Sequence, residues 1–295
     1  MSQEEAMVIQ AFAKINWSLD ITGVREDGYH LMDMLMQPVS LADEITLETS
    51  GTLSITTGGY PPCRADETNL AWCAAAALKK ATGYPGGVSI HVQKSIPIGA
   101  GMGGGSSDAA GVLYGLNRLW KTDLPSDELE HIGLTLGADV PFALRGGLSR
   151  TRGIGEILEN FEYKYNYWLV VIQPCAGLST ARVFSLWKKE ADVDRPDTET
   201  ALSALKTGDF LRLCRSIGNV LQPVACRLRP EIENACSSLL QEGASAAGMT
   251  GSGSAVFGVF RNAAAAEKAY KTLSSSEKNI FLCHTQQDSL RILDE

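Results

Sequence analysis

The sequence predicts an α+β protein built from two domains. Its 295 residues suffice for two domains of ordinary size. Strand and helix patterns are mixed along the chain without a regular β-α-β alternation, which favours α+β over a parallel α/β architecture. Near residues 158–166 a glycine-rich polar stretch gives way to a new apolar strand. We therefore expect one domain at residues 1–160 and a second at 161–295.

The first domain begins with an alternating strand. From residue 12 to 21, apolar residues alternate with polar ones that include Lys14 and Asn16, which predicts a half-buried strand with one polar face. An Asp-Gly turn follows at residues 27–28. Further strands are expected at 43–48, 52–57 and 86–97, and an alanine-rich helix at 69–80.

The patterns of alternating strands and of helices continue through the rest of the chain. Apolar residues at helical spacing predict a helix through 112–120, and Ser126 and Gly137 are the expected N-cap and stop of the next one. Short strands are expected within 142–158. The remaining expected elements are strands at 167–174, 254–260 and 279–285, and helices near 180–189, 199–206, 208–216, 230–241 and 262–274.

Composition limits the classes of function. With 44% hydrophobic and 20% charged residues, the sequence is typical of a soluble globular protein, and it lacks any run of about 18 apolar residues that could span a membrane. A net charge of −8 offers no basic surface for nucleic acid or anionic lipid. Seven widely spaced cysteines without a C-x-x-C pattern predict reduced thiols rather than a zinc site. The acidic start of the sequence favours a cytoplasmic protein.

A glycine-rich loop, IPIGAGMGGGSSDAAG at residues 96–111, is the most unusual feature of the sequence. Gly99, Gly101 and Gly104 satisfy the dinucleotide pattern G-x-G-x-x-G, but the acidic residue about 20 positions on, Asp123, lies in a polar stretch broken by proline. A Walker A loop would end in Gly-Lys-Ser/Thr, which is absent here. Both of these interpretations fail on their context.

A third interpretation is a phosphate cradle of another design. Successive glycine amides would face an anion, and the following helix would add the positive end of its dipole. Ser106 and Ser107 could cap that helix or donate hydroxyls to phosphate oxygens and to Mg²⁺. Asp108 suits the dipole but would repel phosphate unless a cation lay between them. The alternative, a flexible surface turn, does not explain why the loop runs directly into a helix.

Several polar residues are candidates to accompany the loop. Lys14 is either an ordinary exposed lysine or part of a compact polar face that lines a pocket. Asp139, two residues before Pro141, is either a helix cap or a carboxylate that accepts a proton from a substrate hydroxyl, and the spacing leaves both open. A second glycine-serine loop at 248–260 favours a nucleotide held between two domains.

The motifs resemble those of the GHMP small-molecule kinases, a family that includes galactokinase, homoserine kinase and mevalonate kinase. The stretch PIGAGMGGGSSDAAG is similar to their central motif. AFAKINWSLDITGVREDGYHLMDMLMQPVSLAD, at 11–43, is more specific and resembles the branch that phosphorylates the 2-hydroxyl of 4-diphosphocytidyl-2-C-methyl-D-erythritol. LGADVPFAL, GLSTARVF and GMTGSGSAVFG follow in that branch's order, whereas Met102 stands where leucine is common.

This resemblance implies a fold and two substrates. The fold is a ribosomal-protein-S5-like α/β domain followed by a ferredoxin-like domain, with the active site between them. The substrates are ATP, used with Mg²⁺, and the cytidine-diphosphate methylerythritol, in non-mevalonate isoprenoid precursor biosynthesis. No nucleic acid or membrane partner is implied, and we expect a monomer or a weak homodimer.

The resemblance also implies residue roles. Asp139 would be the base, and Lys14 would keep it charged and steady the transferring phosphoryl group. The nucleotide side would comprise Asn69, Lys94, Pro97, Gly99, Gly101, Gly103, Gly104, Gly105, Ser106 and Ser107. The cytidyl substrate would lie against Asn16, Tyr29, His30, Thr180 and Phe184, with Phe184 stacking on cytosine. No residue is assigned as a metal ligand. A kinase acting on another alcohol, and a nucleotide-binding module without catalysis, remain alternatives.

Overall fold

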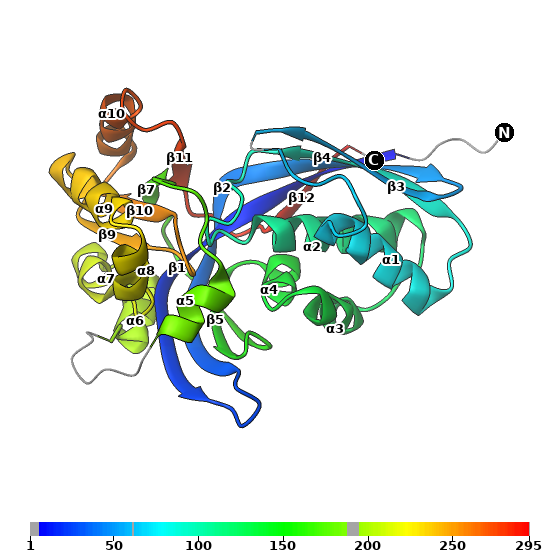
Figure 1. Cartoon of the computed structure of the whole chain (residues 1–295), viewed down its shortest axis with the longest axis horizontal. Helices are drawn as coiled ribbons and strands as arrows, with labels where there is room; N and C mark the ends of the chain where they lie inside the picture. The colour runs from blue at the N-terminus through cyan, green and yellow to red at the C-terminus, as the bar shows by residue number, and fades with distance from the viewer. Residues whose placement is uncertain (1–5, 61, 188–194, 295) are drawn as a thin grey trace.

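Two antiparallel-rich sheets organise the molecule in a computed structural model, which describes residues 6–60, 62–187 and 195–294 (Figure 1). The first sheet follows the order β12-β1-β2-β4-β3, with β5 paired to β2 and β6, and β8 paired to β1. Its strands are β1 (Ala6–Val24), β2 (His30–Ser50), β3 (Leu53–Gly59), β4 (Gly87–Lys94), β5 (Leu148–Gly153), β6 (Ile157–Phe161), β8 (Gly218–Asn219) and β12 (Leu290–Asp294).

The first strand, β1, is buried on both faces at its centre. Its apolar positions pack into the core, as the alternation predicts, but Lys14, Asn16 and Ser18 on the opposite face are buried as well. The expectation of a half-buried strand is therefore wrong here. The cause is tertiary, because the second half of the chain covers this face, with the Ser18 hydroxyl 3.0 Å from that of Thr198.

Four helices lie on one face of the first sheet: α1 (Leu70–Thr82), α2 (Gly104–Leu119), α3 (Ser126–Leu136) and α4 (Val140–Arg145) (Figure 1). Their apolar faces close a core with β1, β2 and β4. Two predictions need correction. Pro125, not Ser126, occupies the N-cap of α3. Residues 142–145 are helical because Pro141 lies in the first turn of a short helix, where proline is favoured, and Gly146 is the C-cap.

The second sheet has the order β11-β7-β10-β9, and all its pairs are antiparallel. Its strands are β7 (Trp168–Ile172), β9 (Ala246–Met249), β10 (Val256–Phe260) and β11 (Ile280–His284). The accompanying helices are α5 (Thr180–Leu186), α6 (Thr198–Thr207), α7 (Phe210–Ser216), α8 (Gln222–Leu228), α9 (Glu231–Gln241) and α10 (Ala263–Leu273). The path β7-α9-β9-β10-α10-β11 is a ferredoxin-like β-α-β-β-α-β unit. The expected α+β class and ferredoxin-like second half are confirmed.

The chain crosses between the two sheets more than once. The first sheet receives β12 from the very end of the described chain, with Ala11 opposite Leu290, and β8 from the middle of the second half. The first sheet therefore takes two strands, β8 and β12, from beyond residue 160, and the division at that residue stays a prediction. The expected helix near 180–189 ends at Leu186 in the structure, and residues 188 and 189 lie outside the described residues. Within the described ranges, no helix is long and apolar enough to cross a membrane.

Candidate active site

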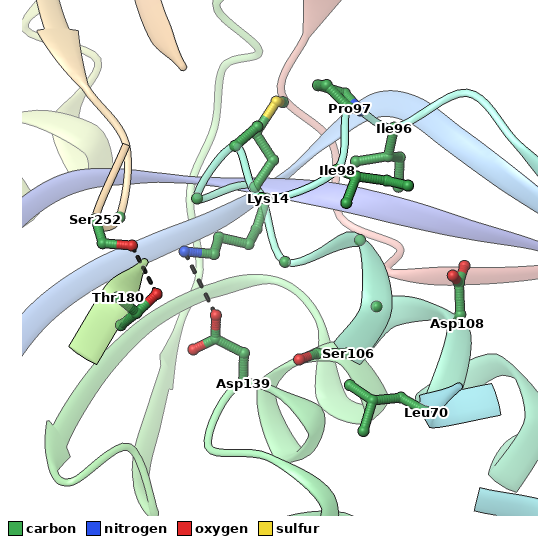
Figure 2. Close-up of a pocket in the computed structure, with 18 of the residues that line it drawn as sticks. Lys14, Leu70, Ile96, Pro97, Ile98, Ser106, Asp108, Asp139, Thr180 and Ser252 are labelled. Atoms are coloured by element: carbon green, nitrogen blue, oxygen red, sulfur yellow. Dashed lines mark hydrogen bonds and ion pairs between the residues drawn. The ribbon is translucent and has the colours of Figure 1, made fainter. Parts of the chain in front are cut away.

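A cavity of about 610 Å³ lies where the glycine loop, β1, the start of α4 and the second glycine-serine loop meet (Figure 2). Most of the residues predicted for the site line it: Lys14, Asn16, Asn69, Lys94, Pro97, Gly99, Gly101, Gly103, Gly104, Gly105, Ser106, Asp139, Thr180 and Phe184. Ser107, Tyr29 and His30 are not among the lining residues. One cavity thus collects segments that are up to 238 positions apart, since it joins Lys14 to Ser252.

The glycine loop touches the polar face of β1. The backbone N–H of Lys14 donates to the carbonyl of Met102 at 3.0 Å. Gly103 has φ +74°, and a Cβ placed there would lie 3.1 Å from Lys14 Cγ and 3.8 Å from Asp139 Oδ2. A side chain at position 103 would meet both a strained backbone and a crowded site. Glycine is therefore required where the loop passes Lys14 and Asp139.

The start of α2 faces the cavity without a side-chain cap. The helix begins at Gly104. Gly103 occupies the N-cap position and, having no side chain, makes no capping hydrogen bond. The prediction that Ser106 or Ser107 caps it is wrong, because both lie inside the first turn. Ser107 donates its hydroxyl to Phe12 O and its N–H to Gly103 O, so it anchors the helix. The free N–H groups of the first turn and the positive end of the helix dipole are therefore available to bind an anion.

Lys14 and Asp139 form a couple beside this helix start (Figure 2). Lys14 Nζ lies 3.5 Å from Asp139 Oδ2 and donates to Asn16 Oδ1 at 2.8 Å. The Lys14 side chain is 6% exposed and that of Asp139 31%, which excludes an ordinary solvated lysine. Asp139 occupies the N-cap position of α4, but its side chain makes no capping hydrogen bond. Its carboxylate faces the cavity and the cation instead.

The second glycine-serine loop interlocks with the first. A Cβ on Gly101 would lie 2.3 Å from the carbonyl oxygen of Thr250, so the two loops approach as closely as backbone allows. Asn16 Oδ1 accepts from Gly251 N at 3.0 Å, which ties β1 to the same loop. The Ser252 hydroxyl lies 2.8 Å from that of Thr180 at the start of α5 (Figure 2). The loops therefore form one wall of the cavity.

An aromatic group borders the far end of the cavity. The His30 ring lies 5.1 Å from the Phe184 ring and 5.8 Å from the Trp187 ring, centroid to centroid. Tyr29 is 61% exposed, in the turn between β1 and β2. On the opposite side, Asn69 caps α1 through its side chain, which accepts from Ala71 N.

Lys94 lies in a buried ion cluster beneath the glycine loop. Its Nζ pairs with Asp43 Oδ2 on β2 and, at 2.7 Å, with Asp108 Oδ2 on α2. Burial works to lower the pKa of Lys94, but the two carboxylates outweigh it and raise that pKa. Burial, with Asp43 nearby, raises the pKa of Asp108 to about 7 despite the pull of Lys94. The predicted repulsion between Asp108 and a phosphate is thus reduced by a cation, which the chain itself provides.

Comparison with known proteins identifies the family. The description "GHMP kinases N terminal domain" matches residues 69–147, and "GHMP kinases C terminal" matches residues 201–279. The chain belongs to the GHMP kinases. It is therefore an ATP-dependent small-molecule kinase, as the resemblance implied.

Individual relatives of this GHMP kinase cover nearly its whole length. It is 40% identical to a 4-diphosphocytidyl-2-C-methyl-D-erythritol kinase of Alkaliphilus metalliredigens, over 97% of this chain and 98% of that protein. A protein of the same name from Exiguobacterium sibiricum is 41% identical over 90% and 93% of the two chains. A crystal structure of 4-(cytidine 5'-diphospho)-2C-methyl-D-erythritol kinase superposes with a TM-score of 0.80 at 35% identity, over 95% and 99%. Homoserine kinase from Cytophaga hutchinsonii shares the fold, with a TM-score of 0.76 at 18% identity over 99% of each chain.

The site of this GHMP kinase fits a metal ion that is held mainly by the nucleotide. Among the residues that the structure describes, no group of three or more His, Cys, Asp or Glu side chains could hold a metal by itself. Mg²⁺ in phosphate-transfer sites typically takes one or two protein oxygens, with phosphate and water completing its shell. The Ser106 hydroxyl points toward Asp139 across the mouth of α2 (Figure 2). Both side chains line the cavity and carry oxygens that such an ion could bind.

Asp108 of this kinase predicts a pH dependence of stability. Its folded pKa of about 7 lies above the unfolded value of 3.8, so the folded state retains a proton that the unfolded state loses. Stability should therefore fall as pH rises from 4 to 7, by at most about 1.4 kcal/mol per pH unit. We expect Asp108→Asn to gain stability relative to the wild type across that window in urea unfolding. If the difference in free energy of unfolding between the wild type and Asp108→Asn were independent of pH, this prediction would be contradicted.

Sequence reasoning missed two groups that lie next to this cavity. Asp43 sits in a strand that looks ordinary by its alternation, and only the fold brings it to Lys94. Trp187 follows the GLSTARVF motif and was not predicted for the site, although an aromatic residue one turn beyond Phe184 was a visible signal.

Proposed function

We propose that this GHMP kinase transfers the γ-phosphoryl group of ATP to the 2-hydroxyl of 4-diphosphocytidyl-2-C-methyl-D-erythritol, a step of non-mevalonate isoprenoid precursor synthesis. One observation carries the proposal. The Lys14–Asp139 couple lies against the uncapped start of α2, with Gly103 between them. A phosphate on the helix amides would meet a cation and a carboxylate at once.

The chemistry proposed for these residues is mainly positioning and charge neutralisation. The amides at the start of α2 would bind the phosphates of ATP, and Lys14 would neutralise charge that develops during transfer. Asp139 would accept the proton of the 2-hydroxyl. Mg²⁺, held by phosphate oxygens with Ser106 or Asp139, supplies further neutralisation of phosphate charge when bound. Asn16 would hold Lys14 in place through its 2.8 Å hydrogen bond.

The cytidyl end of the substrate is assigned to the aromatic border of the cavity. Phe184 lines the cavity and His30 packs on it, so a base could stack there. Thr180 would contact the substrate beside it, and the exposed Tyr29 would reach the base only if its turn closed over it. The adenine end would lie near Asn69 and the backbone around Lys94.

Turnover with a panel of alcohols tests this proposal. Coupled ADP release should be observed with the cytidyl methylerythritol substrate and not with homoserine or mevalonate, the substrates of other GHMP kinases. Turnover with homoserine or mevalonate instead would show that the protein is a kinase with a different substrate. No turnover with any of them, together with tight ATP binding, would favour a binding module.

Phe184→Ala is expected to raise the KM for the cytidyl substrate without raising the KM for ATP. Loss of one base–aromatic stack, typically about 1–3 kcal/mol, should raise the KM for the cytidyl substrate by about 5- to 150-fold. The KM for ATP should change little, because Phe184 lies at the opposite end of the cavity from Asn69. Steady-state kinetics with each substrate varied in turn would check this. An equal loss for both ligands would contradict the assignment.

We also propose a cytoplasmic location. All seven cysteines are free thiols, which suits a reducing compartment.

A further inference from the structure

Asp43 joins three segments that converge beneath the glycine loop. Its Oδ1 accepts from the backbone N–H of Ser95 at 2.6 Å and of Ile96 at 2.8 Å. Its Oδ2 pairs with Lys94 Nζ, which in turn pairs with Asp108 on α2. Lys94 ends β4, and Asp108 lies in the helix that the loop enters. Both arms of the loop are therefore fastened at its base.

The cluster lies directly under the start of α2. A Cβ on Gly104 would be 2.9 Å from Ile96 Cγ2 and 3.4 Å from Lys94 Nζ. Gly104 is the first residue of α2 and lines the cavity. Any shift of Lys94 or Ile96 would therefore move the amides at the helix start.

The burial of this cluster indicates a role in geometry. The side chains of Asp43, Lys94 and Asp108 are 0%, 3% and 5% exposed. Removing three ionisable groups from water is costly, and an apolar set of the same volume is often at least as stabilising. What an ion cluster adds is a set of directional contacts that fix segments relative to one another.

We propose that Asp43 is a positioning residue of the nucleotide site, which fixes the entering arm of the glycine loop against the first turn of α2. The inference rests on the proposed role of that loop as the cradle for the phosphates of ATP. Asp43 itself is not among the residues that line the cavity, so it acts through the loop and not on the ligand.

Asp43→Asn tests this role, with Asp108→Asn as the matched control. An amide has only one acceptor oxygen, so the side chain introduced by Asp43→Asn can serve the backbone N–H groups or Lys94, but not both. In Asp108→Asn the amide oxygen can still accept from Lys94, and the contacts of Asp43 stay intact. Binding of a non-hydrolysable ATP analogue with Mg²⁺ should weaken by about tenfold or more in Asp43→Asn and by less than about threefold in Asp108→Asn. Binding of the cytidyl substrate should change by less than about twofold in both variants.

The outcomes separate this inference from the proposed function. Failure of the wild type to bind the ATP analogue would count against the phosphate cradle. Equal losses of affinity for the ATP analogue in the two variants, or equal losses of affinity for both ligands, would overturn the positioning role. Asp43 would then only stabilise the fold. Should Asp43→Asn not fold, hydrogen exchange in the wild type decides instead. The amides of residues 95 and 96 should then be protected with and without nucleotide, and rapid exchange there would overturn the inference.

Discussion

Asp139→Asn is expected to lower turnover by about 10²- to 10⁴-fold, the range for loss of a general base. The side chain lies 3.5 Å from Lys14 Nζ and faces the cavity, whereas an amide cannot accept the proton of the substrate hydroxyl. The side chain of Asp139 makes no capping hydrogen bond, so α4 should persist in the variant. Steady-state kinetics with thermal unfolding of the variant would measure both effects.

Asp197→Asn is a matched control at an aspartate N-cap outside the cavity. Asp197 Oδ1 caps α6 by accepting from Thr200 N, outside the cavity, so Asp197→Asn should retain wild-type turnover. If Asp139→Asn also retained near-normal turnover, Asp139 would be a turn residue and the proposed mechanism would be wrong.

Lys14→Met is expected to lower turnover by about 10²- to 10³-fold, the scale for losing one group that stabilises charge in the transition state. Methionine has a similar length and suits a buried position, so the apolar stem should still pack. The loss should fall mainly on kcat, because the charge develops during transfer. Arginine should not rescue it, since the Lys14 side chain is 6% exposed and its ammonium contacts both Asn16 and Asp139, a site that the wider guanidinium does not match.

The control for Lys14 is a lysine that serves packing alone. Lys206 Nζ lies over the Phe161 ring at 4.9 Å, away from the cavity, so Lys206→Met should leave kcat unchanged. A Lys14→Met enzyme with unchanged kcat and only a raised KM would instead assign Lys14 to ground-state binding.

Local patterns in the sequence predicted the elements that carry the site. Glycine density marked the loop, because only glycine tolerates the φ of +74° and the crowding at Gly103. Alternation placed Lys14 and Asn16 on one face of β1, and helical spacing placed α2 after the loop. The resemblance to the GHMP kinases then brought Asp139 to the same site.

Long-range contacts could not be predicted in this way. The alternation of β1 carried no sign that its polar face would be covered, because the cover comes from Thr198 and Thr250 far along the chain. Pairing of β12 with β1 is likewise a choice among sheet edges that local pattern does not encode. Ser126 failed as a cap for a smaller reason, since the helix started one residue earlier than the pattern of caps suggests.

A crystal structure with Mg²⁺ and a non-hydrolysable ATP analogue would test the central claim most directly. We predict phosphate oxygens within about 3 Å of the amides of residues 103–106, with the terminal phosphate beside Lys14 and Asp139. Phosphates bound elsewhere, with the terminal one more than about 10 Å from the Lys14–Asp139 couple, would contradict it.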